Sequence, residues 1–124
     1  MALTIGIPRE TAAGETRVSM VPDVADQLLT MHDDLDIVVE TGAGEHAYHD
    51  DADYESAGCR VADRAEVLEA DVVTKVAPPS DEELEAFSDG QVLIGLLDPL
   101  GRAEAAQTLA DAGVTALAME LVPR

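Results

Sequence analysis

The chain has almost no aromatic residues and only one cysteine. Its 124 residues include no tryptophan, one phenylalanine and two tyrosines. Domains that stack on nucleic-acid bases need aromatic side chains or a basic face, and this sequence has neither. The lone Cys59 excludes an intrachain disulfide, which fits a reducing compartment.

The sequence also lacks targeting and membrane signals. Its start, Met1 to Thr4, has no basic segment of the kind that opens a signal peptide. No apolar run approaches the roughly 20 residues that a membrane-spanning helix requires. We therefore expect a soluble, cytoplasmic chain.

Positive charge is scarce. There are 26 acidic residues against 7 basic ones, which gives a net charge of −19, and Lys75 is the only lysine. This charge repels phosphate backbones and anionic membranes. It is compatible with disorder, with an acidic surface for a cationic partner, or with a halophilic protein whose self-repulsion is screened by high salt. The regular apolar segments argue against disorder, and the even spread of the acidic residues favours the halophilic interpretation.

Short apolar segments alternate with helical patterns along the chain. Hydrophobic residues make up 47% of it, and with so few aromatics the core must be aliphatic. Several segments are continuously apolar, which is typical of strands buried on both faces. We predict one α/β domain over residues 1–124, with a mainly parallel, Rossmann-like sheet of about six strands flanked by helices. The predicted strands are Leu3–Ile7, Ile37–Glu40, Cys59–Ala62, Val72–Val76, Val92–Leu97 and Val114–Met119. The predicted helices are Pro22–Met31, Asp50–Ala57, Asp63–Glu69, one that begins after Ser80, and Gly101–Ala112.

Two basic residues fall where an α/β fold binds ligands. Arg17 follows the first predicted strand, and Lys75 lies inside the fourth. In a parallel sheet the carboxyl ends of these strands can open onto one crevice, where an arginine fork and a lysine ammonium hold a small carboxylate. The alternative is a lysine that reaches solvent and an arginine paired with a nearby glutamate. Asp98, at the end of the fifth strand, is expected to be a counter-ion for the two cations.

A glycine-rich segment, residues 42–47, has the G-x-G-x-x-A spacing of the dinucleotide fingerprint. The fingerprint requires its glycines to open a helix directly, so that the amino end of the helix faces the pyrophosphate. Here His46 to His49 intervene, and the best helix cap is Asp50, whose charge would repel a pyrophosphate. We therefore interpret the segment as a turn that lets the chain leave the sheet.

One cluster combines histidines with carboxylates, the residue types that bind metal ions. It has no cysteine and none of the usual zinc or calcium spacings, so a solvated acidic loop is the favoured interpretation. Cys59 is expected to be a small, buried and unreactive side chain. The cluster consists of His46, His49, Asp50, Asp51 and Asp53.

Segments spread along the chain carry a recognisable family pattern. They are Ile5–Glu10, Glu15–Val18 with Pro22, Glu40–Glu45, Asp71–Val76 and Ala118–Arg124. Together they resemble the amino-terminal domain shared by alanine dehydrogenase and the alpha subunit of nicotinamide nucleotide transhydrogenase. The ending Ala-Met-Glu-Leu-Val-Pro-Arg is similar to the transhydrogenase branch. Alanine dehydrogenases place a catalytic histidine where this chain has Asp98.

The resemblance implies part of the alpha subunit of a proton-translocating NAD(P) transhydrogenase, which transfers a hydride from NADH to NADP. It implies that NAD is bound by a segment absent from this chain and NADP by a partner subunit. It also implies membrane-embedded partner subunits, a homodimer and a cytoplasmic position at the membrane. It assigns no catalytic residue here, but Arg17 and Lys75 match the positions that hold the substrate carboxylate in the dehydrogenases. The alternatives are an alanine-dehydrogenase-like oxidoreductase and a non-catalytic docking module for a separate NAD-binding chain.

Overall fold

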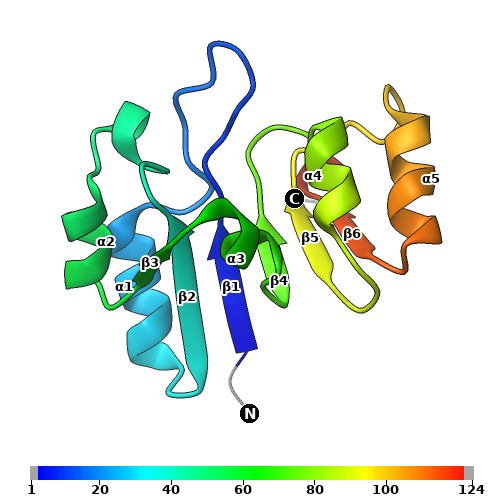
Figure 1. Cartoon of the computed structure of the whole chain (residues 1–124). Helices are drawn as coiled ribbons and strands as arrows, with labels where there is room; N and C mark the ends of the chain where they lie inside the picture. The colour runs from blue at the N-terminus through cyan, green and yellow to red at the C-terminus, as the bar shows by residue number, and fades with distance from the viewer. Residues whose placement is uncertain (1–2, 122–124) are drawn as a thin grey trace.

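Six parallel strands form the sheet of this computed structural model, which describes residues 3–121. The strands are β1 (Leu3–Ile7), β2 (Leu35–Glu40), β3 (Arg60–Ala62), β4 (Val72–Thr74), β5 (Val92–Gly95) and β6 (Thr115–Ala118). Their order is β3-β2-β1-β4-β5-β6, and every neighbouring pair is parallel (Figure 1). The predicted Rossmann-like sheet is thus confirmed. The order reverses between β1 and β4, and such sheets bind ligands at the carboxyl edge beside this point.

The helices begin where local sequence signals place them. Their bounds are α1 (Pro22–Met31), α2 (Asp51–Ser56), α3 (Arg64–Leu68), α4 (Asp81–Ala86) and α5 (Ala103–Asp111), with short 3-10 turns η1 (Glu45–Ala47) and η2 (Met119–Leu121). Pro22 opens α1, where its missing N–H costs nothing. Asp50, Asp63 and Ser80 cap the next three helices by accepting a backbone N–H.

Alternate side chains of the strands enter two separate cores. Ile37 and Val39 of β2 pack with residues of α1 and α2, whereas Val38 between them packs with residues of α3, α4 and α5. The first core is closed by Tyr54 of α2, whose hydroxyl donates to the Met20 carbonyl oxygen at 2.7 Å. Strands β5 and β6 contribute to the second core only.

Two strands end two residues earlier than predicted, for the same physical reason. The backbone N–H of Val76, beyond β4, donates to the Glu10 carboxylate instead of to a neighbouring strand. The N–H of Leu97, beyond β5, donates to the Glu120 carboxylate. A hydrogen bond from the backbone to a side chain far away in the sequence cannot be predicted from the local hydrophobic pattern. The other predicted bounds also shift by at most two residues.

Candidate functional site

Lys75 lies directly after β4, at the carboxyl edge of the sheet, and the protein encloses it. Its side chain is 1% exposed, and its Nζ is 3.1 Å from Glu10 Oε1 and 3.1 Å from Glu83 Oε2. A buried ammonium is costly unless carboxylates compensate its charge, and here two of them do. The interpretation of a lysine that reaches solvent is therefore wrong.

Arg64, at the start of α3, extends this ion pair into a network. Its Nη2 is 2.7 Å from Glu83 Oε2, and its Nη1 is 2.9 Å from Glu40 Oε1. One oxygen of Glu83 is thus shared by Arg64 and Lys75. Burial alone would raise the pKa of Glu83, but the Ser80 N–H and the two cations outweigh it and hold the pKa below its ordinary value.

Glu10 ties the loop that follows β1 to the loop that follows β4. Its Oε2 accepts from the backbone N–H of Val76 at 2.8 Å, and its Oε1 accepts from the N–H of Ala77 at 3.0 Å. With the Lys75 ammonium, this carboxylate therefore receives three donors, and its side chain is only 2% exposed. Both loops rise at the same end of the sheet (Figure 1). These donors satisfy both oxygens of the Glu10 carboxylate and hold the two loops together.

Arg17 stands apart from this site. Its side chain is 66% exposed, and its guanidinium makes a two-pronged pair with Glu15, with Nε–Oε2 at 3.0 Å and Nη2–Oε1 at 2.9 Å. Hydrogen bonds from Arg17 hold the pKa of Glu15 at about 2. Within residues 3–121 no hydrogen bond or ion pair joins Arg17 to Lys75. The arginine is thus arranged as the alternative interpretation predicted.

Asp98 is not the counter-ion of either cation, so that expectation is wrong. Its Oδ1 accepts from the Gly101 N–H at 3.2 Å, and its own N–H donates to Glu120 Oε2 at 2.9 Å. Its backbone has a φ of +47°, in the left-handed region. In the described part of the chain, Lys75 and Arg17 take their carboxylates from the glutamates named above.

The glycine-rich segment 42–47 forms a turn, as predicted. Gly42 has a φ of +79°, and η1 separates the glycines from α2. The Asp51 carboxylate accepts from the Gly42 N–H at 2.9 Å and from the Thr41 hydroxyl at 2.6 Å. A side chain of the protein therefore occupies the donors that a phosphate would need.

Two carboxylates of the histidine–carboxylate cluster cap the start of α2. Asp50 and Asp53 form a capping box in which each carboxylate accepts the other residue's N–H at 3.0 Å. Over residues 3–121 no three histidine, cysteine or acidic side chains are grouped to hold a metal ion. Cys59 is buried, and burial raises the pKa of its thiol to about 11, which makes it a poor nucleophile.

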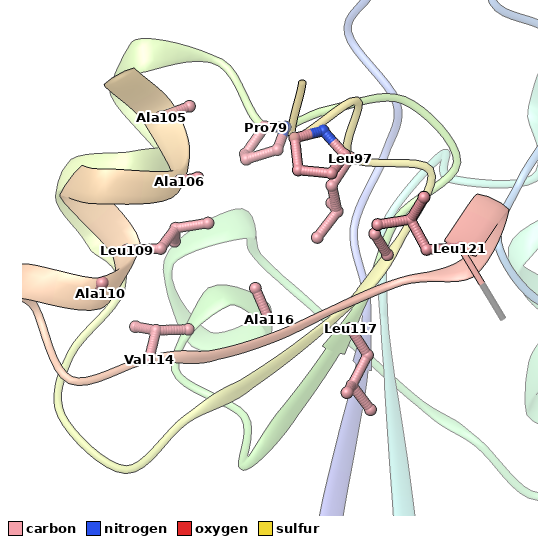
Figure 2. Close-up of a pocket in the computed structure, with 12 residues that line it drawn as sticks. Pro79, Leu97, Ala105, Ala106, Leu109, Ala110, Val114, Ala116, Leu117 and Leu121 are labelled. Atoms are coloured by element: carbon pink, nitrogen blue, oxygen red, sulfur yellow. The ribbon is translucent and has the colours of Figure 1, made fainter. Parts of the chain in front are cut away.

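An apolar groove of about 510 Å³ lies between α5 and β6, at the edge of the sheet. Figure 2 shows Ala106 and Leu109 of α5 on one side and Ala116 of β6 on the other. Leu121 forms part of the wall and is 61% exposed. The groove offers contact area and no catalytic group. Among the helices that the structure describes, none is long and apolar enough to cross a membrane.

Glu10, Arg64 and Glu83 were not predicted from the sequence as partners of Lys75. The available signal was Lys75 itself, because a lysine in a strand buried on both faces requires carboxylates nearby. The sequence offers 26 acidic candidates and does not say which of them the loops bring close.

Residues 6–124 match the family model "Alanine dehydrogenase/PNT, N-terminal domain". The chain belongs to this family. It is 41% identical over 124 residues to the NAD(P) transhydrogenase subunit alpha of Cereibacter sphaeroides, covering 98% of the chain and 23% of that protein. It is 40% identical over 121 residues to the alanine dehydrogenase of Bacillus subtilis (strain 168), covering 97% and 32%. The crystal structure of transhydrogenase from Sinorhizobium meliloti superposes with a TM-score of 0.91 at 39% identity, covering 98% of the chain and 36% of that one.

The chain thus spans about a quarter to a third of the length of these relatives. These relatives come from both branches of the family, and two of the three are transhydrogenases, which is consistent with the resemblance to the transhydrogenase branch. Of the ending motif Ala118–Arg124, residues 122–124 lie outside the described residues.

Proposed function

We propose that the chain is the amino-terminal domain of a proton-translocating NAD(P) transhydrogenase alpha subunit, and contributes to hydride transfer from NADH to NADP. One observation supports the proposal: the transhydrogenase-like ending contacts the backbone at the position where a dehydrogenase would have its catalytic histidine. The Glu120 carboxylate, in the transhydrogenase-like ending, accepts from the N–H of Asp98, where a dehydrogenase would have its catalytic histidine. Backbone donors, first that of Asp98, lower the pKa of Glu120 below its ordinary value.

In this proposal the chain alone does not transfer hydride. NAD is bound by a segment outside these residues and NADP by a partner subunit, and the assembly joins membrane-embedded subunits at the cytoplasmic face as a homodimer. The Asp51 carboxylate in the glycine-rich turn supports a nucleotide site elsewhere. Lys75, and Arg17 on the neighbouring loop, are the residues we propose for binding a small carboxylate.

A second candidate is a non-catalytic docking module for a separate NAD-binding chain. The apolar groove between α5 and β6 favours it, because Leu117 and Leu121 on its wall are 48% and 61% exposed. Exposed apolar patches of this kind mark contact surfaces.

A domain exchange tests the proposal. The chain replaces the matching segment of the Cereibacter sphaeroides alpha subunit in one chimera and of the Bacillus subtilis alanine dehydrogenase in another. We expect the first chimera to retain hydride transfer between NADH and an NADP analogue when mixed with its partner subunits. We expect the second to lose oxidation of alanine, and an Asp98→His variant of it to recover part of that activity. The reverse pattern would assign the chain to the dehydrogenase branch.

Calorimetry with NADH in molar salt distinguishes a docking module from a domain of a transhydrogenase alpha subunit. We expect no binding by the chain alone, and binding once the rest of the alpha subunit is added as a separate polypeptide. A stable complex that binds NADH but still transfers no hydride once the NADP-binding partner subunit is added would favour the docking module. Binding by the chain alone would mean that the glycine-rich turn is a nucleotide site.

A further inference from the structure

We propose that Glu120 is a positioning residue, which fixes the path on which the chain leaves this domain relative to the loop after β5. The inference rests on the proposed function and deepens it, because hydride transfer requires the NAD-binding remainder of the subunit to be held in one orientation. Each oxygen of the Glu120 carboxylate accepts a backbone N–H, Oε1 from Leu97 at 3.2 Å and Oε2 from Asp98 at 2.9 Å. Two bonds to consecutive residues fix the side chain in direction as well as in position.

These two hydrogen bonds continue the link between β5 and β6 beyond the end of the sheet. The last backbone pair of the two strands joins Gly95 to Ala118, and Leu97 and Glu120 each lie two residues further on. The Leu97 side chain is buried in the second core, so its N–H belongs to a fixed part of the domain. Glu120 therefore ties the turn η2 to that fixed part.

The side chains on either side of Glu120 do little to hold this turn. All three residues of η2 are exposed, and the exposed fractions of Met119 and Leu121 are 49% and 61%. Side chains that stay in water contribute little packing energy. The two hydrogen bonds to the Glu120 carboxylate are therefore a principal constraint on the direction of the backbone at this point.

The loop on the other side of the contact depends on Glu120 as well. Asp98 has a φ of +47°, a conformation that a residue with a side chain keeps only where its surroundings hold it. Its Oδ1 accepts from the Gly101 N–H at 3.2 Å, its carbonyl oxygen accepts from the Arg102 N–H at 2.9 Å, and its own N–H donates to Glu120. Of these three bonds, only the one to Glu120 leads out of the loop, so it couples the shape of the loop to the path of the chain.

This loop lies at the edge of the sheet where folds of this class bind ligands. The carboxyl ends of β4, β5 and β6 share that edge, because the three strands are parallel (Figure 1). The family match is to an amino-terminal domain, and the matched segment is only 23% of the Cereibacter sphaeroides alpha subunit. In the proposed function the remainder of such a subunit binds NAD. Glu120 is thus placed between the ligand-binding edge and the part that brings the nucleotide to it.

Glu120→Gln tests the inference in the Cereibacter sphaeroides chimera, which joins this chain to the rest of an alpha subunit. Glutamine keeps the length of the side chain and one acceptor oxygen, but it places an NH2 donor against the second backbone N–H. We expect the kcat of hydride transfer to fall about ten-fold, because misaligned reactants adopt the reactive geometry less often. The Kd for NADH should stay within about two-fold of its original value, because the nucleotide is bound elsewhere.

Glu104→Gln is the matched control, because Glu104 is an exposed glutamate in the first turn of α5 and the substitution removes the same charge. It should change neither kcat nor Kd. An unchanged kcat in Glu120→Gln would overturn the inference. A variant whose kcat, NADH affinity and unfolding midpoint all fall together would also overturn it, because that pattern shows a loss of folding and not of alignment.

Amide hydrogen exchange of the 124-residue chain gives a readout that does not depend on hydride transfer. We expect the Leu97 and Asp98 amides to exchange at least about ten-fold faster in Glu120→Gln than in the wild type, and at the wild-type rate in Glu104→Gln. Equal rates in Glu120→Gln would overturn the inference. If the chimera with the original Glu120 transfers no hydride, the proposed function fails, and the exchange rates still decide whether Glu120 holds the loop and the turn together.

Discussion

The buried charge network makes a strong prediction for Glu83→Gln. Glutamine keeps the shape of the side chain and can still complete the capping box of α4. It removes the negative charge shared by Arg64 Nη2 at 2.7 Å and Lys75 Nζ at 3.1 Å. Its amide NH2 must also face a cation or the Ser80 N–H, which are all donors. Loss of one partner from a buried ion pair costs about 3–5 kcal/mol of unfolding free energy.

Urea unfolding in molar salt at pH 7 measures this loss. Glu82→Gln is the matched control, because Glu82 is the exposed neighbour in the same first helical turn. A charge there interacts mainly with the helix dipole, and its removal should cost less than about 1 kcal/mol. The reasoning is refuted if the two variants have unfolding free energies within about 1 kcal/mol of each other.

The difference in unfolding free energy between the wild type and Glu83→Gln should disappear in acid. The folded state holds the pKa of Glu83 below its ordinary value of 4.5. Its stabilisation is therefore complete above that value and is lost as the pH falls below it, since the unfolded chain then binds the proton more readily. The gap between the two unfolding free energies should shrink from pH 5 downward. A gap that stays constant to the acid limit of folding would contradict the assigned charge.

Three further predictions concern stability. The net charge of −19 predicts an unfolding midpoint that rises from dilute buffer to molar sodium chloride, and identical midpoints would exclude the halophilic interpretation. Gly6→Ala should lower the unfolding free energy by about 1–3 kcal/mol, because a Cβ there would clash with the backbone carbonyl oxygen of Val67. Urea curves that overlay those of the wild type would show that α3 moves away freely. The raised pKa of Cys59, about 11 against an ordinary 9, means that the unfolded thiol ionises first. Stability should therefore fall between pH 9 and 11, and Cys59→Ala should flatten that fall.

Much of the fold could be predicted because its signals are local. Strands covered on both faces appear as continuous apolar runs such as Ile37–Glu40, and the caps at Asp50 and Ser80 act within four residues. Strand order could not be predicted, because the pairing of β1 with β4 depends on contacts such as Gly6 with Val73, far apart in the sequence. The close approach of Gly6 to α3 could not be predicted either, because it also joins residues far apart in the sequence.

The place of Lys75 at the carboxyl edge of the sheet could be predicted, but its partners could not. Topology alone brings Lys75 to the switch point, and its burial follows from the apolar strand before it. The choice of Glu10 over Glu15 as its partner depends on how an irregular loop folds, and both glutamates lie on that loop. Arg17, nine residues beyond Pro8 on the same irregular loop, is 66% exposed and pairs with Glu15 for the same reason.

The Arg17–Glu15 and Lys75–Glu10 ion pairs should also respond differently to salt. The Arg17–Glu15 pair is exposed on the arginine side, so high salt screens it and frees the guanidinium for an anion from solution. The Lys75–Glu10 pair is enclosed, at 1% and 2% exposure, and salt screens it little. The exposed pair is therefore open to competition from bulk ions, whereas Lys75 keeps its pairs with Glu10 and Glu83. The unfolding free energy that Glu10→Ala loses should thus stay nearly constant as the salt concentration rises, whereas any loss from Glu15→Ala should shrink. Urea unfolding of both variants at low and at molar salt measures the difference, and equal salt dependence would contradict it.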